Sequence, residues 1–232
     1  MPPLYPDLVV TANRHAVCTQ VARWFIHDLR NPTQALTLLT GMMDGSGEFQ
    51  MAETLREATA HVGRSLALLD RLLALAPPGQ VSHPISILDS LRTVAAFYQV
   101  HHPSVVLDIE AVRETPLPAV RGVAHDLELV FLNLVLNSLE ALRGRPDGRI
   151  VVTATHTGTI VRVTVADNGP GIAPALEPHL FEPGMSGWST GEFPGLGLAA
   201  SRIVAERHGW TLRFAGSGTP GARFELNLPT IG

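Results

Sequence analysis

The chain has 232 residues, a net charge of -4 at pH 7 and 45% hydrophobic residues. Only 16% of the residues are charged, so the chain has ample material for a buried core and does not have the composition of a disordered protein. The acidic pI of about 6.2 argues against a basic surface for nucleic acid. The single cysteine, Cys18, excludes an internal disulfide and a zinc site made of several cysteines. Because neither a long apolar run nor a basic leader is present, we expect a cytoplasmic protein without membrane insertion.

The first third of the chain has the hydrophobic spacing of two long helices. Apolar side chains recur at steps of three and four residues from Cys18 to Met43, and again from Met51 to Ala76. The glycine-rich segment 41–50 is typical of a turn, and the prolines in 77–80 end the second helix. Two such helices alone bury little surface, so we predict a helical hairpin over residues 1–76 that forms a four-helix bundle by dimerisation. Packing of the hairpin on the chain's own second half is the alternative.

The remainder, residues 81–232, has the mixed periodicities of an α+β domain. The segments with helical spacing are 85–100, 124–144 and 195–209. The segments with the pattern of strands are 104–111, 149–157, 160–167, 211–216 and 222–229. We therefore predict a mixed or antiparallel sheet with helices packed on one face.

The sequence FIHDLRNPTQAL, in the first helix, places a histidine away from the apolar stripe. Asp28 is adjacent to His27, and Asn31 lies one helical turn further along the same face. A neutral imidazole is a nucleophile, and a neighbouring carboxylate orients its ring and stabilises its charge. Pro32 removes a helical hydrogen bond, a cost that is more easily tolerated where a site is built. A histidine that simply occupies a solvated face is the alternative for this segment.

Two asparagines, Asn133 and Asn137, lie four residues apart in the otherwise apolar helix predicted over 124–144. Buried amides are costly unless they find hydrogen-bonding partners. An amide oxygen is a suitable ligand for Mg²⁺, which otherwise keeps phosphates and waters in its shell. These residues therefore indicate either a magnesium and phosphate site or a polar pair on a helix surface.

Two glycine-containing segments flank a predicted loop. In DNGPGI, Asp167 ends a strand and can accept a hydrogen bond from an exocyclic amine. Gly169 and Gly171 permit positive φ and a close approach of the backbone to a ligand. In PGLGLAAS, Gly195 and Gly197 open a helix whose free amides and dipole favour phosphate. Each segment taken alone is also typical of an ordinary turn.

The order and spacing of these motifs closely resemble those of sensor histidine kinases over residues 15–229. HDLRNP is similar to the H box of that family, NLVLNSLEAL to the N box, DNGPGI to the G1 box, LFEPGMSG to the F box and GLGLA to the G2 box. HDLRNP together with NSLEA most resembles the subgroup typified by nitrogen-regulation kinases. The resemblance implies a dimerisation and phosphoacceptor hairpin over residues 1–76. It also implies a Bergerat-type α/β sandwich over residues 81–232 that binds ATP.

The resemblance further implies an ATP-dependent protein-histidine autokinase. His27 would attack the γ-phosphate, Asp28 would orient or deprotonate its ring, and Asn31 would position a water when the phosphorylated partner is dephosphorylated. The phosphoryl group would then pass to the receiver domain of a response regulator, and the kinase would act as a homodimer. Because 26 residues precede His27, we expect the signal to come from a separate sensor protein, or the chain to be part of a longer one.

For the nucleotide, the resemblance implies that Asn137 coordinates Mg²⁺, Asn133 assists at the phosphates and Asp167 binds the adenine amine. The glycines that would shape the pocket and its lid are Gly169, Gly171, Gly195 and Gly197. Related ATPases of the gyrase type carry a general-base glutamate at the position of Asn133. An amide cannot take a proton from water, so transfer to His27 is favoured over hydrolysis.

Two departures from the family pattern keep a second function open. The predicted lid has no basic side chain, because no Arg or Lys occurs between Arg162 and Arg202. Glu140 stands three residues after Asn137, where many relatives carry lysine. The alternative function is thus a non-catalytic dimeric phosphotransfer or adaptor module with a decayed ATP site. Arg143 is a candidate for the missing phosphate contact, or else a solvated residue that interacts with the helix dipole.

Overall fold

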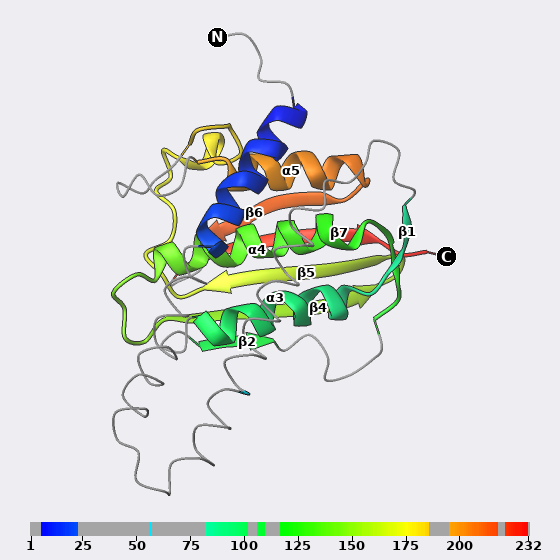
Figure 1. The fold of residues 1–232 in the computed structure, drawn as a ribbon, viewed down its shortest axis with the longest axis horizontal. Helices are drawn as coiled ribbons and strands as arrows, with labels where there is room; N and C mark the ends of the chain where they lie inside the picture. Colours follow the sequence, from blue (N-terminus) through cyan, green and yellow to red (C-terminus); the bar gives the residue numbers. More distant parts are fainter. Residues whose placement is uncertain are drawn as a thin grey trace, which may run out of the picture.

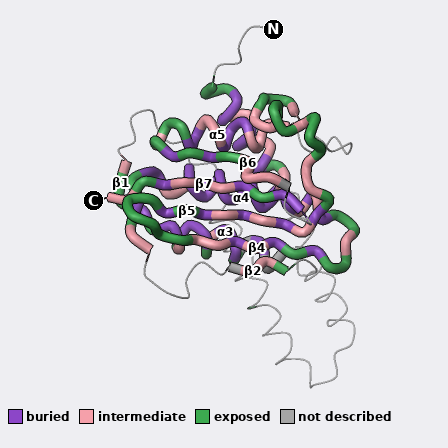
Figure 2. Tube along the Cα trace, turned by 180° about the vertical axis from the view of Figure 1, so that it is seen from behind, coloured by how far each residue is buried: buried purple, intermediate pink, exposed green. Residues whose placement is uncertain are grey.

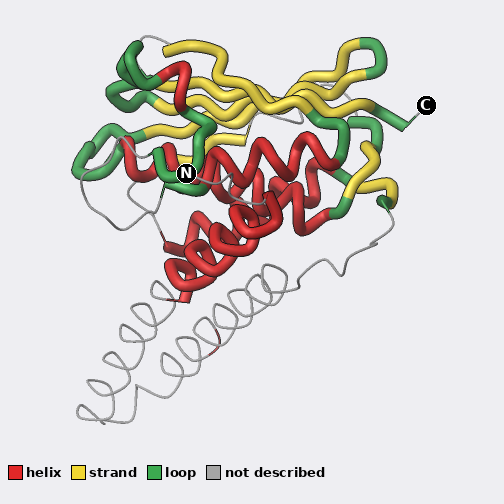
Figure 3. Tube along the Cα trace, turned by 90° about the horizontal axis from the view of Figure 1, so that it is seen from above, coloured by secondary structure: helices red, strands yellow, loops and turns green. Residues whose placement is uncertain are grey.

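The computed structural model describes residues 6–22, 56, 82–101, 106–109, 117–185, 195–217 and 221–231. The described residues form a five-stranded sheet with helices packed against one of its faces (Figure 1, Figure 3). The predicted α+β class of the second unit is therefore confirmed. The predicted phosphoacceptor residues His27, Asp28 and Asn31 lie outside the described residues, as does nearly all of the second helix of the hairpin.

The sheet has the strand order β2–β4–β5–β7–β6 and is mixed. Its strands are β2 (Val106–Ile109), β4 (Arg149–Thr157), β5 (Ile160–Asp167), β6 (Thr211–Ser217) and β7 (Ala222–Pro229). β2 pairs with β4 in parallel, and all other neighbours in this sheet are antiparallel. All five predicted strands are thus present.

The alternation of side chains along β5 determines on which face of the sheet its last side chain lies. Val161, Val163 and Val165 are buried against the helices, while the residues between them are partly or fully exposed (Figure 2). Asp167 continues the same series by two residues, so its side chain also points to the helical side of the sheet. The carboxylate of Asp167 is therefore buried at the end of a valine-rich strand.

Three labelled helices cover this face: α3 (Ile87–His101), α4 (Ala124–Ala141) and α5 (Gly197–Arg207). α4 contacts both of the other two and β5, and its residues from Asp126 to Leu136 are all buried. A helix that is covered on every side must be apolar around its whole circumference, which explains why α4 is the most hydrophobic of the three predicted helices. None of the helices in the described part of the chain is long and apolar enough to cross a membrane.

A further helix, over residues 6–22, packs on α4 and α5 (Figure 1, blue). Its apolar residues Val9, Val10, Val17, Cys18 and Val21 belong to the same buried core as the sheet. The helix begins well before Cys18, where the predicted stripe starts. Cys18 and Val21 are buried within this chain, which corresponds to the alternative packing on the second half. The four-helix bundle is not confirmed, since the rest of both stripes lies outside the described residues.

Three short elements were not predicted. β1 (His83–Ile85) pairs with β3 (Val120–Gly122) in a separate two-stranded antiparallel sheet. A single turn of 3-10 helix, η1 (Glu177–His179), lies in the segment between β5 and α5. Elements of three residues are too short to show a hydrophobic period, which is why the sequence did not indicate them.

Candidate functional site

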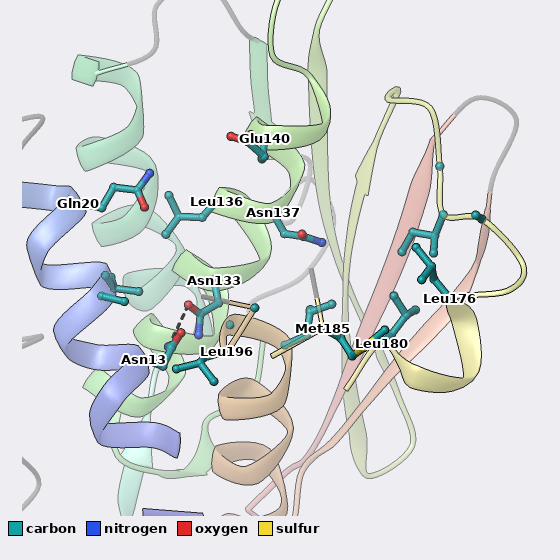
Figure 4. A pocket seen from close by; sticks show the side chains of 18 of the residues that line it. Asn13, Gln20, Asn133, Leu136, Asn137, Glu140, Leu176, Leu180, Met185 and Leu196 are labelled. Atoms are coloured by element: carbon teal, nitrogen blue, oxygen red, sulfur yellow. Dashed lines mark hydrogen bonds between the residues drawn. The ribbon is translucent and has the colours of Figure 1, made fainter. Parts of the chain in front are cut away.

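A cavity of about 290 Å³ lies between the helix over residues 6–22, α4, the segment after β5 and the start of α5 (Figure 4). Its size is close to the lower end of small-molecule sites, which span roughly 300–1,000 Å³. The polar side chains that line it are Asn13, Gln20, Asn133, Asn137 and Glu140. The remaining side chains of its wall are apolar, so the cavity fits a ligand with one flat apolar part and a few polar contacts.

Asp167 lies at the end of β5, where its carboxylate is held by three hydrogen bonds. Oδ1 accepts from the backbone N–H groups of Gly169 (2.8 Å) and Ala222 (3.2 Å), and Oδ2 accepts from Oγ of Ser138 (3.3 Å). Burial raises the pKa of Asp167, and these hydrogen bonds together with the charge of Arg145 offset only part of the increase. A carboxylate has about four acceptor positions, so one position remains for a donor from a ligand.

Gly169 and Gly171, which follow Asp167, need to be glycine for different reasons. Gly171 lines the cavity and has φ of 77°, so the positive φ predicted for this position is confirmed. Gly169 is not among the residues with positive φ, which corrects the prediction for that position. Its need for glycine is steric, because a Cβ there would lie 2.8 Å from Oδ1 of Asp167 and 3.1 Å from Cβ of Ala141.

The two glycines at the start of α5 also line the cavity. Gly195 has φ of 66°, and a Cβ on it would lie 2.7 Å from the carbonyl oxygen of Met185. Gly184 donates its N–H to the carbonyl of Gly195 across 3.1 Å, so a residue within the loop predicted over 177–194 contacts the residue that follows that loop. Gly197 is the first residue of α5, and Leu196 before it provides no side-chain cap for the helix. The first turn of α5 therefore has N–H groups available to an anion.

The two asparagines of α4 both line the cavity. Asn137 is half-buried and projects into the cavity (Figure 4). Asn133 is buried; its Oδ1 accepts from Nδ2 of Asn13 (3.1 Å), and its Nδ2 donates to Oγ of Ser201 (3.0 Å). The alternative of an exposed polar pair on a helix surface is therefore wrong.

Sequence reasoning missed the contribution of the helix over residues 6–22. Asn13, Ala16, Val17 and Gln20 form one wall of the cavity, and their spacing of three, one and three residues places them on one face of the helix. The sequence feature that could have indicated this wall is the pair Asn13 and Gln20, two polar residues seven positions apart beside apolar ones. The spacing defines such a face but does not say what it will pack against.

A cluster of charged side chains holds the helix over residues 6–22 beside the cavity. Arg14 forms a buried ion pair with Asp126 of α4, and Nε2 of His208 lies 2.8 Å from the second carboxylate oxygen. Burial alone would raise the pKa of Asp126, but the hydrogen bond from His208 and the neighbouring positive charges lower it overall. A second, more exposed ion pair joins Asp7 to Arg207 of α5.

Arg143, the candidate phosphate contact, is paired within the protein. Its Nε and Nη2 both donate to Oε2 of Glu140, across 3.1 and 2.7 Å. Glu140 lines the cavity and its side chain is 6% exposed, whereas the side chain of Arg143 is 53% exposed and is not part of the wall. The structure thus places an acidic side chain in the cavity wall, and Arg143 contacts it from the exposed side.

The described part of the predicted lid supplies apolar groups to the cavity, namely Leu180 and Met185 (Figure 4). The guanidinium carbon of Arg202, the first basic residue after the lid, lies 3.8 Å from the centre of the Phe181 ring. A cation over an aromatic face is stabilised there. Arg202 is therefore held against the F-box phenylalanine, outside the cavity wall.

Comparisons with known proteins agree with the motifs. Residues 122–231 match the family described as histidine kinase-, DNA gyrase B-, and HSP90-like ATPase. The chain is 29% identical to the C4-dicarboxylate transport sensor protein DctB of Rhizobium meliloti over 95% of its length, and 28% identical to the sensory histidine kinase/phosphatase NtrB of the same organism over 82%. It spans 36% of the first relative and 53% of the second.

Among solved structures, full-length ShkA in complex with AMPPNP matches 99% of this chain and 47% of its own, with a TM-score of 0.56 and 23% identity. This similarity concerns the fold. The relation to histidine kinases, including relatives of the nitrogen-regulation type, that the motifs predicted is confirmed.

Proposed function

We propose that this chain is the catalytic core of a protein histidine kinase that binds ATP in the cavity beside α4; its residues 122–231 match the family described as histidine kinase-, DNA gyrase B-, and HSP90-like ATPase. The observation that carries the proposal is the buried carboxylate of Asp167. It is fixed by Ser138, Gly169 and Ala222 and retains an acceptor position; Asp167 is not itself part of the cavity wall, which begins three residues later at Pro170. A flat base with an exocyclic amine has the chemistry that this arrangement binds.

The adenine amine donates to Asp167 in this proposal, while Gly171 and Ile172 of the cavity wall contact the ring. A base that offers a carbonyl oxygen instead of an amine would place an acceptor against a carboxylate. The hydrogen bonds of Gly169 and Ala222 to Oδ1 keep the carboxylate from turning away. Asp167 therefore selects adenine over a base with the opposite hydrogen-bonding pattern.

The phosphates bind at the first turn of α5, whose N–H groups have neither a side-chain cap nor an acidic neighbour in that turn. Asn137 projects from α4 into the same cavity and supplies one neutral oxygen to Mg²⁺. Mg²⁺ keeps several waters and takes its remaining ligands from phosphates, so a single protein amide fits it. When bound, Mg²⁺ neutralises phosphate charge and orients the transferred group.

His27 is the phosphoacceptor in this proposal. Its imidazole nitrogen forms the new bond to the γ-phosphorus, the bond from that phosphorus to the bridging oxygen breaks, and ADP leaves. Asp28 orients the imidazole or takes its proton, and Asn31 positions a water for the later dephosphorylation of the partner. The phosphoryl group then passes to the receiver domain of a response regulator.

The dimeric hairpin over residues 1–76, followed by an ATP-binding domain over residues 81–232, belongs to the same proposal, as does a separate sensor protein that supplies the signal. Glycines 169, 171, 195 and 197 shape the nucleotide pocket and its lid. Because an amide, Asn133, replaces the general-base glutamate of related hydrolases, this site favours transfer to histidine over transfer to water. No observation favours the adaptor alternative.

Incubation of the chain with γ-labelled ATP and Mg²⁺ tests this function. Wild type should acquire a label that is lost in acid and retained in base, as a phosphoramidate is. His27→Ala should remain unlabelled, whereas His15→Ala, which removes an exposed histidine of the first helix, should be labelled like wild type. Persistent labelling of His27→Ala would contradict the assignment of the phosphoacceptor.

A further inference from the structure

One side of the cavity is formed by a short segment between β5 and α5, residues 176–185, which we term the wall segment. Leu176 and Leu180 lie across the cavity from Gln20 (Figure 4), and Met185 completes this apolar surface. The wall segment consists of turns and the three-residue helix η1, and elements this short are not stable by themselves in water. Its position therefore depends on contacts with the rest of the domain.

Phe181 joins the wall segment to the hydrophobic core. Its ring is partly buried and meets the ring of Phe224 in β7 edge to face, with the ring centroids 6.5 Å apart. Phe224 is 1% exposed, and such an arrangement brings the positive edge of one ring to the negative face of the other. Leu180 lines the cavity and Phe181 does not. Two consecutive side chains thus have separate tasks, one toward the ligand and one toward the core.

Phe181 also contacts Arg202 of α5. The guanidinium carbon of Arg202 lies 3.8 Å from the centre of the ring, so the planar cation stacks on the ring and is attracted by its π electrons. Arg202 is four residues after Leu198, which lines the cavity, and residues at this spacing share a face of the helix. Phe181 is thus held by β7 and by α5 at once.

We propose that Arg202 is a positioning residue of the nucleotide site, which acts through Phe181 to hold the wall segment against the adenine ring. This inference rests on the proposed binding of ATP in the cavity. Arg202 is not among the residues that line the cavity, so its effect on the ligand is indirect. The first basic residue after the predicted lid therefore acts at the base of the nucleotide and not at its phosphates.

A wall segment that is held in place before binding raises the affinity for the base. If the segment is released, it must be ordered when the ligand arrives, and the free energy of ordering is subtracted from that of binding. This subtraction is the same for every ligand that contacts the wall segment. Adenosine and Mg-ATP should therefore be affected equally, which distinguishes positioning from a direct contact with phosphate.

A double-mutant cycle on the intact chain tests the inference. Arg202→Met keeps a long side chain and removes the cation, while Phe181→Leu keeps an apolar side chain and removes the ring. Calorimetry with adenosine and with Mg-ATP compares both variants, their combination and wild type. Arg202→Lys retains a cation, and Arg92→Met is the matched control at a 69% exposed arginine side chain of α3. Thermal unfolding verifies that each variant is folded.

We expect Arg202→Met and Phe181→Leu each to bind both ligands about three- to tenfold more weakly, the effect of one partly buried cation–π contact. The combined variant should bind no more weakly than Phe181→Leu alone, because a cation without the ring has nothing to hold. Arg202→Lys should recover part of the affinity, and Arg92→Met should bind as wild type does.

A loss confined to Mg-ATP would show that Arg202 contacts the phosphates directly and would overturn the inference. Unchanged affinity in Arg202→Met would also overturn it. So would independent, additive losses in Arg202→Met and Phe181→Leu, because these are typical of two residues that only contribute to stability.

Hydrogen exchange without ligand measures the anchoring itself. The N–H groups of Glu182, Gly184 and Met185 donate to backbone carbonyls and report the order of the wall segment. In Arg202→Met they should exchange about threefold faster or more, whereas the N–H groups of β5 should be unchanged. Equal exchange in Arg202→Met and wild type would contradict the inference.

These results differ from a failure of the proposed function. A wild-type chain that binds neither ligand removes the proposed ATP site and this inference together. A wild-type chain that binds both ligands with an affinity independent of Arg202 removes only the inference.

Discussion

Oγ of Ser138 donates to Oδ2 of Asp167 across 3.3 Å, so the helix that carries Asn133 and Asn137 is tied directly to the end of β5. This hydrogen bond keeps the proposed adenine acceptor in register with the proposed magnesium ligand one residue before Ser138. The carboxylate is nevertheless in an unfavourable place, because burial raises its pKa in the folded protein. A site that binds adenine through a buried acid therefore gives up some stability for function.

The pKa of Asp167 gives a prediction about stability. An exposed aspartate in the unfolded chain ionises near pH 3.9, and Asp167 in the folded chain ionises at a higher pH. Its contribution favours folding while the acid is protonated and is lost as the pH rises through the folded pKa. We therefore expect Asp167→Asn, which cannot ionise, to be at least as stable as wild type at pH 7. Below about pH 4 this relative gain should disappear.

The same variant should bind adenosine and Mg-ATP at least tenfold more weakly, because an amide offers one acceptor fewer and can present a donor to the amine. Urea denaturation at pH 7 and pH 4 measures the stability, and calorimetry measures the affinity. Asp108→Asn, at a partly exposed aspartate paired with Arg149, is the control and should bind nucleotide normally. A clear loss of stability in Asp167→Asn at pH 7 would show that the hydrogen bonds outweigh the burial of charge.

Gly221 allows β7 to begin in direct contact with Asp167. Gly221 has φ of 115°, and a Cβ there would lie 1.7 Å from the backbone oxygen of Asp167. Gly216 has a similar φ of 105° but no atom within 4 Å of an added Cβ. Alanine at Gly216 should therefore be destabilising by about 1 kcal/mol through backbone strain alone.

Alanine at Gly221 should add the steric clash and destabilise by about 3 kcal/mol or more. If the chain still folds, Asp167 must shift and adenosine affinity should fall. Urea denaturation of the two variants side by side separates strain from clash. Equal losses at the two positions would mean that β7 moves away from Asp167 at little cost.

Most of the fold follows from local periodicity. The five strands and the helices α3, α4 and α5 were predicted because alternation or helical spacing persists over enough residues in each. β1 and β3 have three residues each, too few for a period. The partner of the first helix could not be predicted, because Cys18 and Val21 are apolar residues that fit an intramolecular core and a dimer equally well.

The residues of the candidate site also differ in whether the sequence could predict them. Asn133, Asn137 and Asp167 stand out within their own segments, since each is polar in an apolar context. The structure brings Asn133 and Asn137 to one cavity, whereas Asp167 lies outside the cavity wall and is hydrogen-bonded to Ser138, the residue after Asn137. Asn13 has no such local signal, because its importance comes from a contact with a residue 120 positions away. Cross-element contacts depend on tertiary packing that no spacing rule encodes.

The ion pair of Arg14 with Asp126 should make docking of the first helix sensitive to acid. The pKa of Asp126 is lowered in the folded chain, so its ionised form contributes stability above the unfolded pKa of about 3.9. That contribution is lost as the pH falls through the lower folded pKa. The relevant window is therefore below about pH 4.

Asp126→Asn removes the carboxylate that forms the buried ion pair with Arg14 and should be destabilising by about 3–5 kcal/mol at pH 7. The difference from wild type should shrink as the pH is lowered below 4, because wild-type Asp126 is then also neutral. Asp7→Asn, at a side chain that is 90% exposed, should change stability by less than about 1 kcal/mol. Urea denaturation between pH 3 and 7 measures both variants, and a pH-independent difference would contradict the linkage.

The pair of Glu140 and Arg143 determines the charge that the cavity presents to a triphosphate. Glu140 is almost fully buried in the wall, and Arg143 contacts it from the exposed side. Removal of the arginine would take away the positive charge that contacts Glu140 beside the proposed phosphate site. We therefore expect Arg143→Ala to weaken Mg-ATP binding about fivefold, an effect of about 1 kcal/mol from like-charge repulsion, while adenosine affinity is unchanged.

A double-mutant cycle distinguishes this indirect effect from a direct phosphate contact of Arg143. Glu140→Gln removes the negative charge and should bind Mg-ATP at least as tightly as wild type. When Arg143→Ala is introduced together with Glu140→Gln, no carboxylate remains to be compensated, so the arginine should no longer matter. Calorimetry with Mg-ATP at low and moderate salt measures all four proteins, and the repulsion should be largest at low salt. If Arg143→Ala weakens binding equally with and without Glu140→Gln, the guanidinium reaches the phosphates itself.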